Sequence, residues 1–156
     1  MTSAGILLYR LRQGVVEVLL GHPGGPLWKN RDEGAWTIPK GLVDEGEDLR
    51  VAAGREFREE MGFDAGEGGE ALAPRRQRSG KTVHVWAVEG DCDAATCRSN
   101  EFSMEWPPKS GRRESFPEID RAGWFDLERA KRKILPGQAP FLDELAQRLA
   151  ARGQSA

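Results

Sequence analysis

Acidic side chains are concentrated in one short segment of this sequence. Of the 25 acidic and 23 basic residues in the chain, 7 and 3 lie within residues 41–63, which leaves 18 and 20 elsewhere. Carboxylates are the hard oxygen ligands that magnesium prefers. We therefore take this segment as a candidate cation site. Its acidic residues are Asp44, Glu45, Glu47, Asp48, Glu56, Glu59 and Glu60.

The spacing within this segment predicts a helix from about residue 48 to residue 61. At about 100° per residue, Glu56 and Glu60 share a face with Leu49, Ala52 and Ala53. A solvated acidic face would lie opposite these apolar residues, so the two carboxylates are expected on the side that packs against a sheet. Crowded carboxylates at a dry surface repel each other, and a divalent cation removes that conflict.

The alternative interpretation is a surface helix held by ion pairs between residues four apart, such as Arg55 with Glu59. From the helix alone, the two interpretations are about equally good. The preceding loop favours the cation site, because Gly41 can bring a backbone carbonyl close to a metal. Lys40, beside it, could place a positive charge near phosphate oxygens.

The complete pattern resembles the signature of a known family. It comprises Gly41, five residues, Glu47, seven residues, Arg55-Glu56-Phe57, one residue, Glu59-Glu60, one residue, and Gly62-Phe63. This pattern is similar to the Nudix box of hydrolases that act on nucleoside diphosphates linked to another moiety. Every fixed polar and glycine position is filled. Both hydrophobic positions are Phe, where aliphatic residues are commoner.

The resemblance implies an α/β fold, namely a Nudix-type α/β/α sandwich with a mixed sheet and a loop–helix–loop catalytic box, in one domain over residues 1–156. It implies Mg²⁺ as cofactor, with Mn²⁺ as a possible substitute. The implied metal ligands are the Gly41 carbonyl, Glu56, Glu59 and Glu60. An ion pair between Arg55 and Glu47 would orient these ligands. The implied catalytic residues are Glu56, Glu59, Glu47, Arg55 and Glu118.

Glu118 is included because some family members place a metal-binding or catalytic glutamate just before a late strand. Here it lies six residues before Trp124. Glu101, Glu105 and Glu114 are competing candidates, and Glu118 as an ordinary loop residue is a further alternative.

The approach to the box suggests a substrate. The residues from Trp36 to Gly41, with Pro39-Lys40-Gly41, resemble the branch that cleaves diadenosine and diphosphoinositol polyphosphates, whereas mutator-type triphosphate hydrolases more often carry Pro-Gly-Gly. Residues 21–28 and 116–137 resemble a bacterial subgroup of predicted nucleotide pyrophosphohydrolases. The expected reaction is Mg-dependent hydrolysis of a diphosphate linkage, best exemplified by diadenosine tetraphosphate giving ATP and AMP. The substrate-binding candidates are Lys40, Trp36, Trp106 and Lys81.

One feature departs from that branch, whose members commonly stack a tyrosine after the box on adenine. The only tyrosine here is Tyr9, far before the box. Stacking would fall to other aromatic residues, each of which could equally belong to the core. They are Trp86, Trp106, Phe102 and Phe116, with Trp106 expected to be the most exposed because Pro107 and Pro108 follow it.

Three other functions stay open. They are a nucleoside triphosphate pyrophosphohydrolase, an RNA 5′-end pyrophosphohydrolase and a non-catalytic nucleotide-binding module. The basic stretches 75–78 and 109–113 could follow a phosphate backbone, but they are short and lack a regular aromatic platform, which favours solvated loops. Non-catalytic modules usually lose box glutamates, and all are present here. A small nucleotide is therefore the expected partner, with nucleic acid less favoured.

Length and composition limit the number of domains and the class of protein. The 156 residues are 38% apolar and carry a net charge of −2, which predicts one globular domain without a general affinity for nucleic acid or anionic membranes. The longest apolar run is only a few residues, so we expect no transmembrane helix or signal peptide. Cys92 and Cys97 are expected to be free thiols in a reducing cytoplasm.

Hydrophobic periodicity and turn residues predict the elements that must position the acidic segment. Expected strands cover 3–11, 15–20, 81–88, 101–106 and 119–125, with short extended pieces at 35–38 and near 72. Expected helices cover 48–61, 126–133 and 140–151. Regular structure should break from residue 22, residues 91–100 and 109–117 should be loops, and the tail 152–156 should fray.

Overall fold

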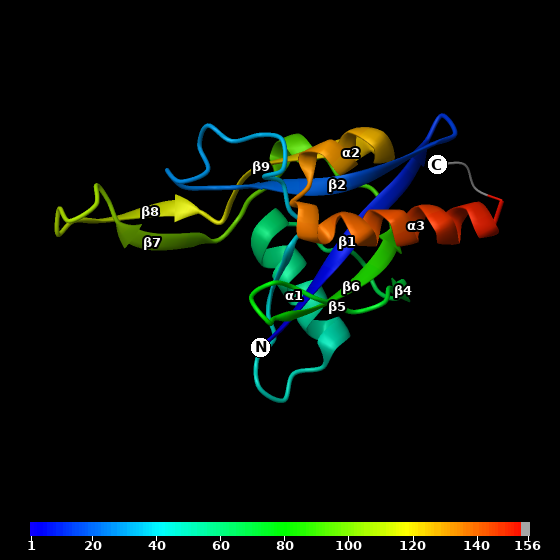
Figure 1. Ribbon diagram of the computed structural model, residues 1–156, viewed down its shortest axis with the longest axis horizontal. Helices are drawn as coiled ribbons and strands as arrows, with labels where there is room; N and C mark the ends of the chain where they lie inside the picture. Colours follow the sequence, from blue (N-terminus) through cyan, green and yellow to red (C-terminus); the bar gives the residue numbers. More distant parts are fainter. Residues whose placement is uncertain (154–156) are drawn as a thin grey trace.

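The computed structural model of the chain describes residues 1–153, which form strands, α-helices and short 3₁₀ turns (Figure 1). The strands are β1 (Thr2–Arg12), β2 (Val15–Pro23), β3 (Lys40–Leu42), β4 (Glu70–Ala71), β5 (Arg75–Arg76), β6 (Thr82–Glu89), β7 (Glu101–Glu105), β8 (Arg113–Pro117) and β9 (Ile119–Asp126). The helices are α1 (Leu49–Met61), α2 (Leu127–Lys133) and α3 (Ala139–Ala151), with 3₁₀ turns η1 (Ala94–Thr96) and η2 (Pro136–Gln138).

Strand β1 lies at the centre of a seven-stranded mixed sheet. The main strand order is β4-β6-β1-β2-β9, with β3 added to β1 and β5 to β6. Strand β1 runs parallel to β6 and antiparallel to β2 and β3. The β1–β2 hairpin turns at Gln13 and Gly14, whose φ angles of 53° and 79° suit the tight turns that match strand twist.

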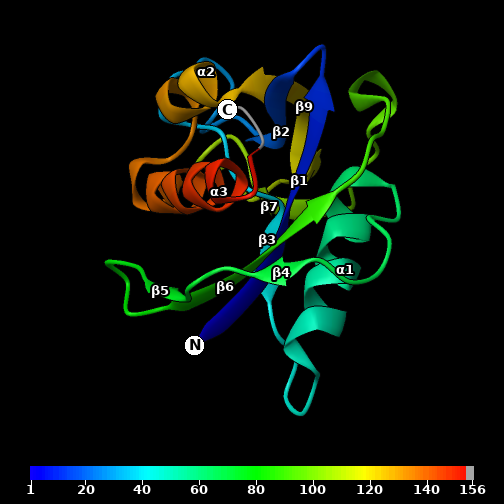
Figure 2. The same ribbon diagram turned by 90° about the vertical axis from the view of Figure 1, so that its right-hand side faces the viewer.

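Helices cover both faces of this sheet (Figure 2). On one face, α1 buries Ala52, Ala53, Phe57 and Met61 against the sheet. On the other face, α3 buries Phe141, Leu142, Leu145 and Leu149 together with side chains of α2. The expected α/β/α sandwich is confirmed.

Helix α1 has the ends that its sequence predicts. The Asp48 side chain caps the first turn by accepting a hydrogen bond of 3.0 Å from the Val51 backbone N–H. Gly62 ends the helix with a φ of 77°, a conformation in which glycine has no steric penalty. The acidic segment is therefore held on a helix with defined limits.

Two expectations for extended structure are wrong. Residues 113–117 form β8 rather than a loop, and β8 pairs with β7 in a separate two-stranded sheet. This hairpin projects from the body of the molecule (Figure 1), so the pattern of β8 lacks the alternation of a half-buried strand. Strand β2 also continues through His22 to Pro23, where its pairing with β9 shifts register. Residues 154–156 of the tail lie outside the described residues.

No helix within residues 1–153 is both long enough and apolar enough to cross a membrane. Cys92 and Cys97, which flank η1, are both free thiols.

Candidate functional site

The last turns of α1, strand β3 and the residues around the β7–β8 hairpin enclose an acidic pocket of about 470 Å³. Residues far apart in sequence meet here because β3 pairs with β1 directly beside α1. The pocket brings together most of the charged residues proposed from sequence. It is lined by Lys40, Gly41, Leu42, Glu56, Glu59, Glu60, Asn100, Glu101 and Glu118.

Gly41 is required by the position of a carboxylate. A Cβ atom at residue 41 would overlap with the carboxylate of Glu56. The backbone N–H of Lys40 donates a hydrogen bond of 3.3 Å to Glu60 Oε1. The missing side chain of Gly41 thus lets the box glutamates come up against β3.

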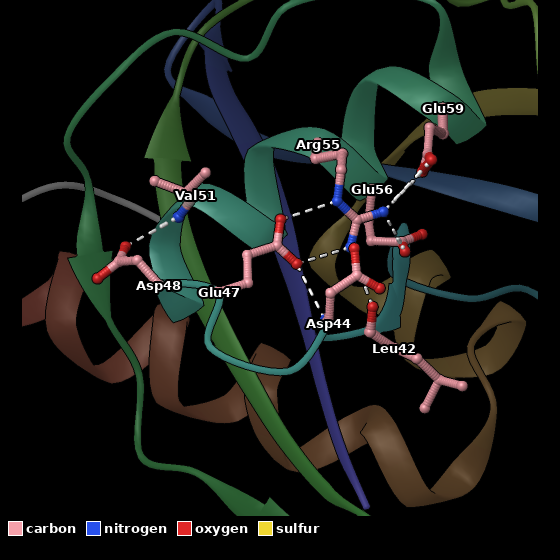
Figure 3. A network of polar contacts seen from close by, with 8 residues as sticks. All are labelled: Leu42, Asp44, Glu47, Asp48, Val51, Arg55, Glu56 and Glu59. Atoms are coloured by element: carbon pink, nitrogen blue, oxygen red, sulfur yellow. Dashed lines mark hydrogen bonds and ion pairs between the residues drawn. The ribbon is translucent and has the colours of Figure 1, made fainter.

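Arg55 is the centre of a polar network beside the pocket (Figure 3). Its Nε and Nη2 donate hydrogen bonds of 2.9 and 3.0 Å to the two carboxylate oxygens of Glu47. Its Nη1 donates to Glu56 and Glu59, at 2.9 Å each, and Nη2 also donates to the Leu42 carbonyl at 3.1 Å. The expected pair of Arg55 with Glu47 is present, and it joins the loop to the helix.

This network differs from the exposed ion pairs of a surface helix. The Arg55, Glu47 and Glu56 side chains are only 25%, 15% and 14% exposed. Bidentate arginine–carboxylate contacts also fix the orientation of both groups. Glu59 does pair with Arg55 four residues earlier, but within a much larger network. The arrangement supports the cation-site interpretation of the helix.

Burial disfavours the ionised form of the carboxyl groups in the pocket. Burial, and then the charge of Glu56, raise the pKa of Glu60 to about 8. Burial is also the main cause that raises the pKa of Glu56. The negative charge of Glu118 acts in the same direction on both carboxyls. Ionising all of these groups together requires additional positive charge.

The basic side chains near the pocket do not supply enough positive charge to balance these carboxylates. Hydrogen bonds from Arg55 lower the pKa of Glu47 to about 2, so much of that guanidinium charge is used outside the pocket. Burial and the neighbouring charge of Lys81 lower the pKa of Lys40. Lys81 therefore lies near Lys40, although it is not among the pocket residues.

The donor chemistry of the pocket fits a hard divalent cation. Glu56, Glu59, Glu60 and Glu118 line one space together with Gly41, and carboxylate oxygens with excess negative charge are what Mg²⁺ and Mn²⁺ prefer. Within residues 1–153, no three His, Cys, Asp or Glu side chains already converge in metal-binding geometry. The Nη1 of Arg55 contacts one oxygen of Glu56 and both oxygens of Glu59, which leaves Oε2 of Glu56 without an arginine contact among residues 1–153.

The four candidates for a metal-binding or catalytic glutamate outside the box differ in whether they line the acidic pocket. Glu118 and Glu101 both line the acidic pocket. The carboxylate of Glu105 instead accepts backbone hydrogen bonds from Lys109 and Gly111 in the hairpin turn. Glu114 lies exposed on β8, opposite Met104.

The expected role of Trp36 in substrate binding conflicts with its position. Its ring is 6% exposed and packs edge-on against Phe125 at 4.9 Å, while its indole N–H donates to Asp32. Trp36 belongs to the core that faces α3, so no face is left for a ligand. The short pattern around Trp36 could not show this, because the ring is buried by distant residues.

Trp106 is not brought to the acidic pocket either. It lies beyond β7 in the outer turn of the hairpin, where its backbone N–H donates a hydrogen bond to the Arg112 carbonyl. Among the other aromatic candidates, Trp86 packs against the α1 side of the core. The rings of Phe102 and Phe116 lie 6.0 Å apart on the hairpin.

Sequence reasoning missed Asn100 and a second cavity. The Asn100 N–H donates a 2.7 Å hydrogen bond to the Glu59 carbonyl at the end of α1. A cavity of about 330 Å³, lined by residues 23–28, Phe102, Met104 and Glu118, shares Glu118 with the acidic pocket. The Gly-Pro cluster at 23–26 marked a break in structure, but no local pattern indicated that the hairpin closes over it.

The family profile described as the NUDIX domain matches residues 1–145. An RNA pyrophosphohydrolase of Caulobacter vibrioides is 50% identical over 52 residues, a match that spans 30% of this chain and only 30% of that protein.

Solved structures resemble the whole fold. An Ap4A hydrolase of C. elegans, in a binary complex, has a TM-score of 0.67 and 25% identity, covering 96% of this chain and 98% of that one. The NUDIX domain of Shewanella oneidensis NrtR, complexed with ADP ribose, has a TM-score of 0.66 and 15% identity over 96% and 88% of the two chains. With its complete box folded into an acidic pocket and a profile match over nearly the whole chain, this chain belongs to the Nudix hydrolase family.

Proposed function

We propose that this chain hydrolyses a diphosphate linkage in a dinucleoside polyphosphate, such as diadenosine tetraphosphate, with Mg²⁺ as cofactor and Mn²⁺ as a substitute. The observation that carries the proposal is the acidic pocket, in which Glu56, Glu59, Glu60 and Glu118 meet beside Lys40. The Pro-Lys-Gly approach to the box and the likeness to the C. elegans Ap4A hydrolase support the substrate class.

The groups proposed to hold the metal are Glu56, Glu59, Glu60 and the Gly41 carbonyl. When bound, a divalent cation neutralises charge on phosphate oxygens and lowers the pKa of the attacking water. Arg55 and Glu47 do not contact the substrate in this account. They keep the helix and the loop in register, so that the ligands can converge.

The remaining steps belong to side chains at the rim. Lys40 binds phosphate oxygens beyond those at the reacting phosphorus, with Lys81 adding positive charge behind it. Glu118 accepts the proton of the attacking water, since it lines the pocket and its charge acts on both Glu56 and Glu60. The water oxygen bonds to phosphorus, the bridging P–O bond breaks, and the electron pair leaves with the departing phosphate.

Product identification tests this proposal. Diadenosine tetraphosphate is incubated with the protein and Mg²⁺, and the products are separated by anion-exchange chromatography. We expect ATP and AMP in equal amounts, and none with Glu118→Gln when assayed over the same period. Two molecules of ADP would contradict asymmetric attack, and an intact substrate would contradict the proposed function.

A second substrate class has one specific observation in its favour. The 52-residue match at 50% identity is to an RNA pyrophosphohydrolase. The projecting hairpin also carries exposed Lys109, Arg112 and Arg113, which could follow a phosphate backbone. Release of pyrophosphate from 5′-triphosphorylated RNA, measured beside the dinucleotide reaction, decides between the two classes.

A further inference from the structure

The second cavity differs chemically from the acidic pocket beside it. It lies between the loop 23–28 and the β7–β8 hairpin, and its walls include Leu27, Trp28, Phe102 and Met104. Within residues 1–153, Glu118 is the single charged residue that lines it, and Glu118 also lines the acidic pocket. The two spaces therefore meet at Glu118, one apolar and aromatic, the other rich in carboxylates.

We propose that this aromatic cavity binds a nucleobase of the substrate, with Trp28, Phe102 and Met104 as its specificity-determining contacts. The inference rests on the proposed function, because it places the phosphates of the same substrate in the acidic pocket. Every nucleobase has a flat aromatic face that stacks on aromatic side chains, and a methionine thioether packs well against aromatic edges. Phosphate groups gain nothing from such walls.

A continuous series of backbone hydrogen bonds holds the two spaces together. The Asn100 N–H donates to the Glu59 carbonyl at 2.7 Å, and the Glu118 N–H donates to the Asn100 carbonyl at 2.8 Å. The Gly24 N–H then donates to the Glu118 carbonyl at 2.9 Å. The end of α1, the root of the hairpin and the loop are thereby fixed relative to one another. A base in the cavity is presented to the box at a defined position.

Two adjacent glycines allow the hairpin to close over the loop. A Cβ atom at Gly24 would overlap with the carbonyl oxygen of Pro117. A Cβ atom at Gly25, where φ is 94°, would lie 2.9 Å from Cζ of Phe102. The Gly24-Gly25 pair therefore sets the position of the Phe102 wall.

The opposite wall is also supported. The Arg31 guanidinium carbon lies 5.6 Å from the centroid of the Trp28 ring, within the range of a cation–π contact. Leu27, next to Trp28, is 65% exposed, so the cavity is reached from solvent. Trp28 and Phe102 thus take the role that sequence reasoning assigned to Trp36 and Trp106.

Binding without hydrolysis tests the proposal separately from the enzyme's activity. Isothermal titration calorimetry with AMP and with ribose 5-phosphate compares two ligands that differ only in the base. We expect wild type to bind AMP more tightly than ribose 5-phosphate. Trp28→Ala should weaken AMP binding about tenfold or more, with ribose 5-phosphate unchanged.

Two further variants control for folding and location. Met104→Ala removes a second wall without an aromatic ring, and it should weaken AMP binding in the same direction with an unchanged circular dichroism spectrum. Trp106→Ala alters an aromatic residue of the same hairpin outside the cavity, and it should bind AMP as wild type does.

The possible failures are distinguishable. Equal affinity of wild type for AMP and ribose 5-phosphate would overturn the base site, as would wild-type AMP affinity in both Trp28→Ala and Met104→Ala, even if diadenosine tetraphosphate is cleaved. Base-dependent binding without any cleavage would overturn the proposed function and leave the base site standing.

Discussion

Glu60 combines burial with a charge that the fold does not neutralise. Glu60→Gln keeps the shape of the side chain but removes the charge that a hard cation requires. Losing even a residue that supports a metal ligand costs about 10- to 100-fold, so we expect hydrolysis to fall by at least about 100-fold. Activity with saturating Mg²⁺ is the measurement, with the exposed Glu114→Gln as control. Equal turnover of both variants would remove Glu60 from the metal site.

The same residue predicts a pH dependence of stability in the metal-free protein. The folded pKa of Glu60 is about 8, against an ordinary value of 4.5. Between these values the folded state retains a proton that the unfolded state has released, so the free energy of unfolding falls as pH rises. One such proton corresponds to a slope of up to ~1.4 kcal/mol per pH unit, and the loss is complete above pH 8.

Urea unfolding in the presence of a chelator, between about pH 5 and pH 8, measures this slope. Other groups titrate as well, so the informative quantity is the difference between wild type and Glu60→Gln. We expect that difference to grow in favour of the variant as pH rises. Parallel curves over the whole range would show that Glu60 ionises normally in the folded protein.

Arg55 acts through geometry as well as charge. Its fork contacts both oxygens of Glu47 while Nη1 holds Glu56 and Glu59. Arg55→Lys keeps the charge but cannot make the bidentate contact, so we expect both Arg55→Lys and Arg55→Ala to lower kcat about 10- to 100-fold. Steady-state kinetics at saturating Mg²⁺ provide the measurement. Full activity of Arg55→Lys would show that charge alone is sufficient.

At the scale of elements, the contact between β3 and α1 determines whether the pocket exists. Gly41→Ala places a methyl group where the Glu56 carboxylate lies, so we expect it to lower activity about 10-fold or more in a protein that still folds. Gly54→Ala is the matched control, because its nearest contact would be the flexible end of Arg50 at 3.2 Å. An alanine inside a helix should stabilise by about 0.5–1 kcal/mol. Circular dichroism and kinetics on both variants check this, and wild-type activity of Gly41→Ala would contradict the required glycine.

The predictability of each element depends on how local its causes are. Helix α1 could be predicted with both ends, because Asp48 and Gly62 act within one turn of it. Strand β8 could not, since among residues 1–153 it pairs only with β7, and it buries little. Its sequence therefore carries no alternation. The end of β2 was likewise predicted too early, at residue 22. The strand continues there because it pairs with β9, which is distant in sequence.

In the candidate site, too, the residues placed by local structure could be predicted, whereas those placed by distant contacts could not. Box residues could be identified from spacing, because a helix converts spacing directly into a shared face. Glu118 and Lys40 also reach the pocket. Trp36 was assigned wrongly, since Phe125 from another strand buries its ring. The second cavity depends on a hairpin folding back onto a glycine pair, which is a tertiary event without a local signal.

At the scale of the whole molecule, the sandwich carries the site at one end of α1, and the projecting hairpin extends it with an apolar cavity. Substrates with a base and several phosphates match this combination of an aromatic and an acidic space. A polyphosphate with a nucleoside at each end also offers phosphate oxygens on both sides of the bond that is cleaved.

The ratio of kcat/KM for diadenosine tetraphosphate to kcat/KM for ATP, measured in excess Mg²⁺, tests this account most directly. We predict that the dinucleotide is preferred at least tenfold, which corresponds to about 1.4 kcal/mol of transition-state stabilisation. A tenfold preference for an ordinary or oxidised nucleoside triphosphate, or for 5′-triphosphorylated RNA in the same assay, would contradict the proposed substrate class.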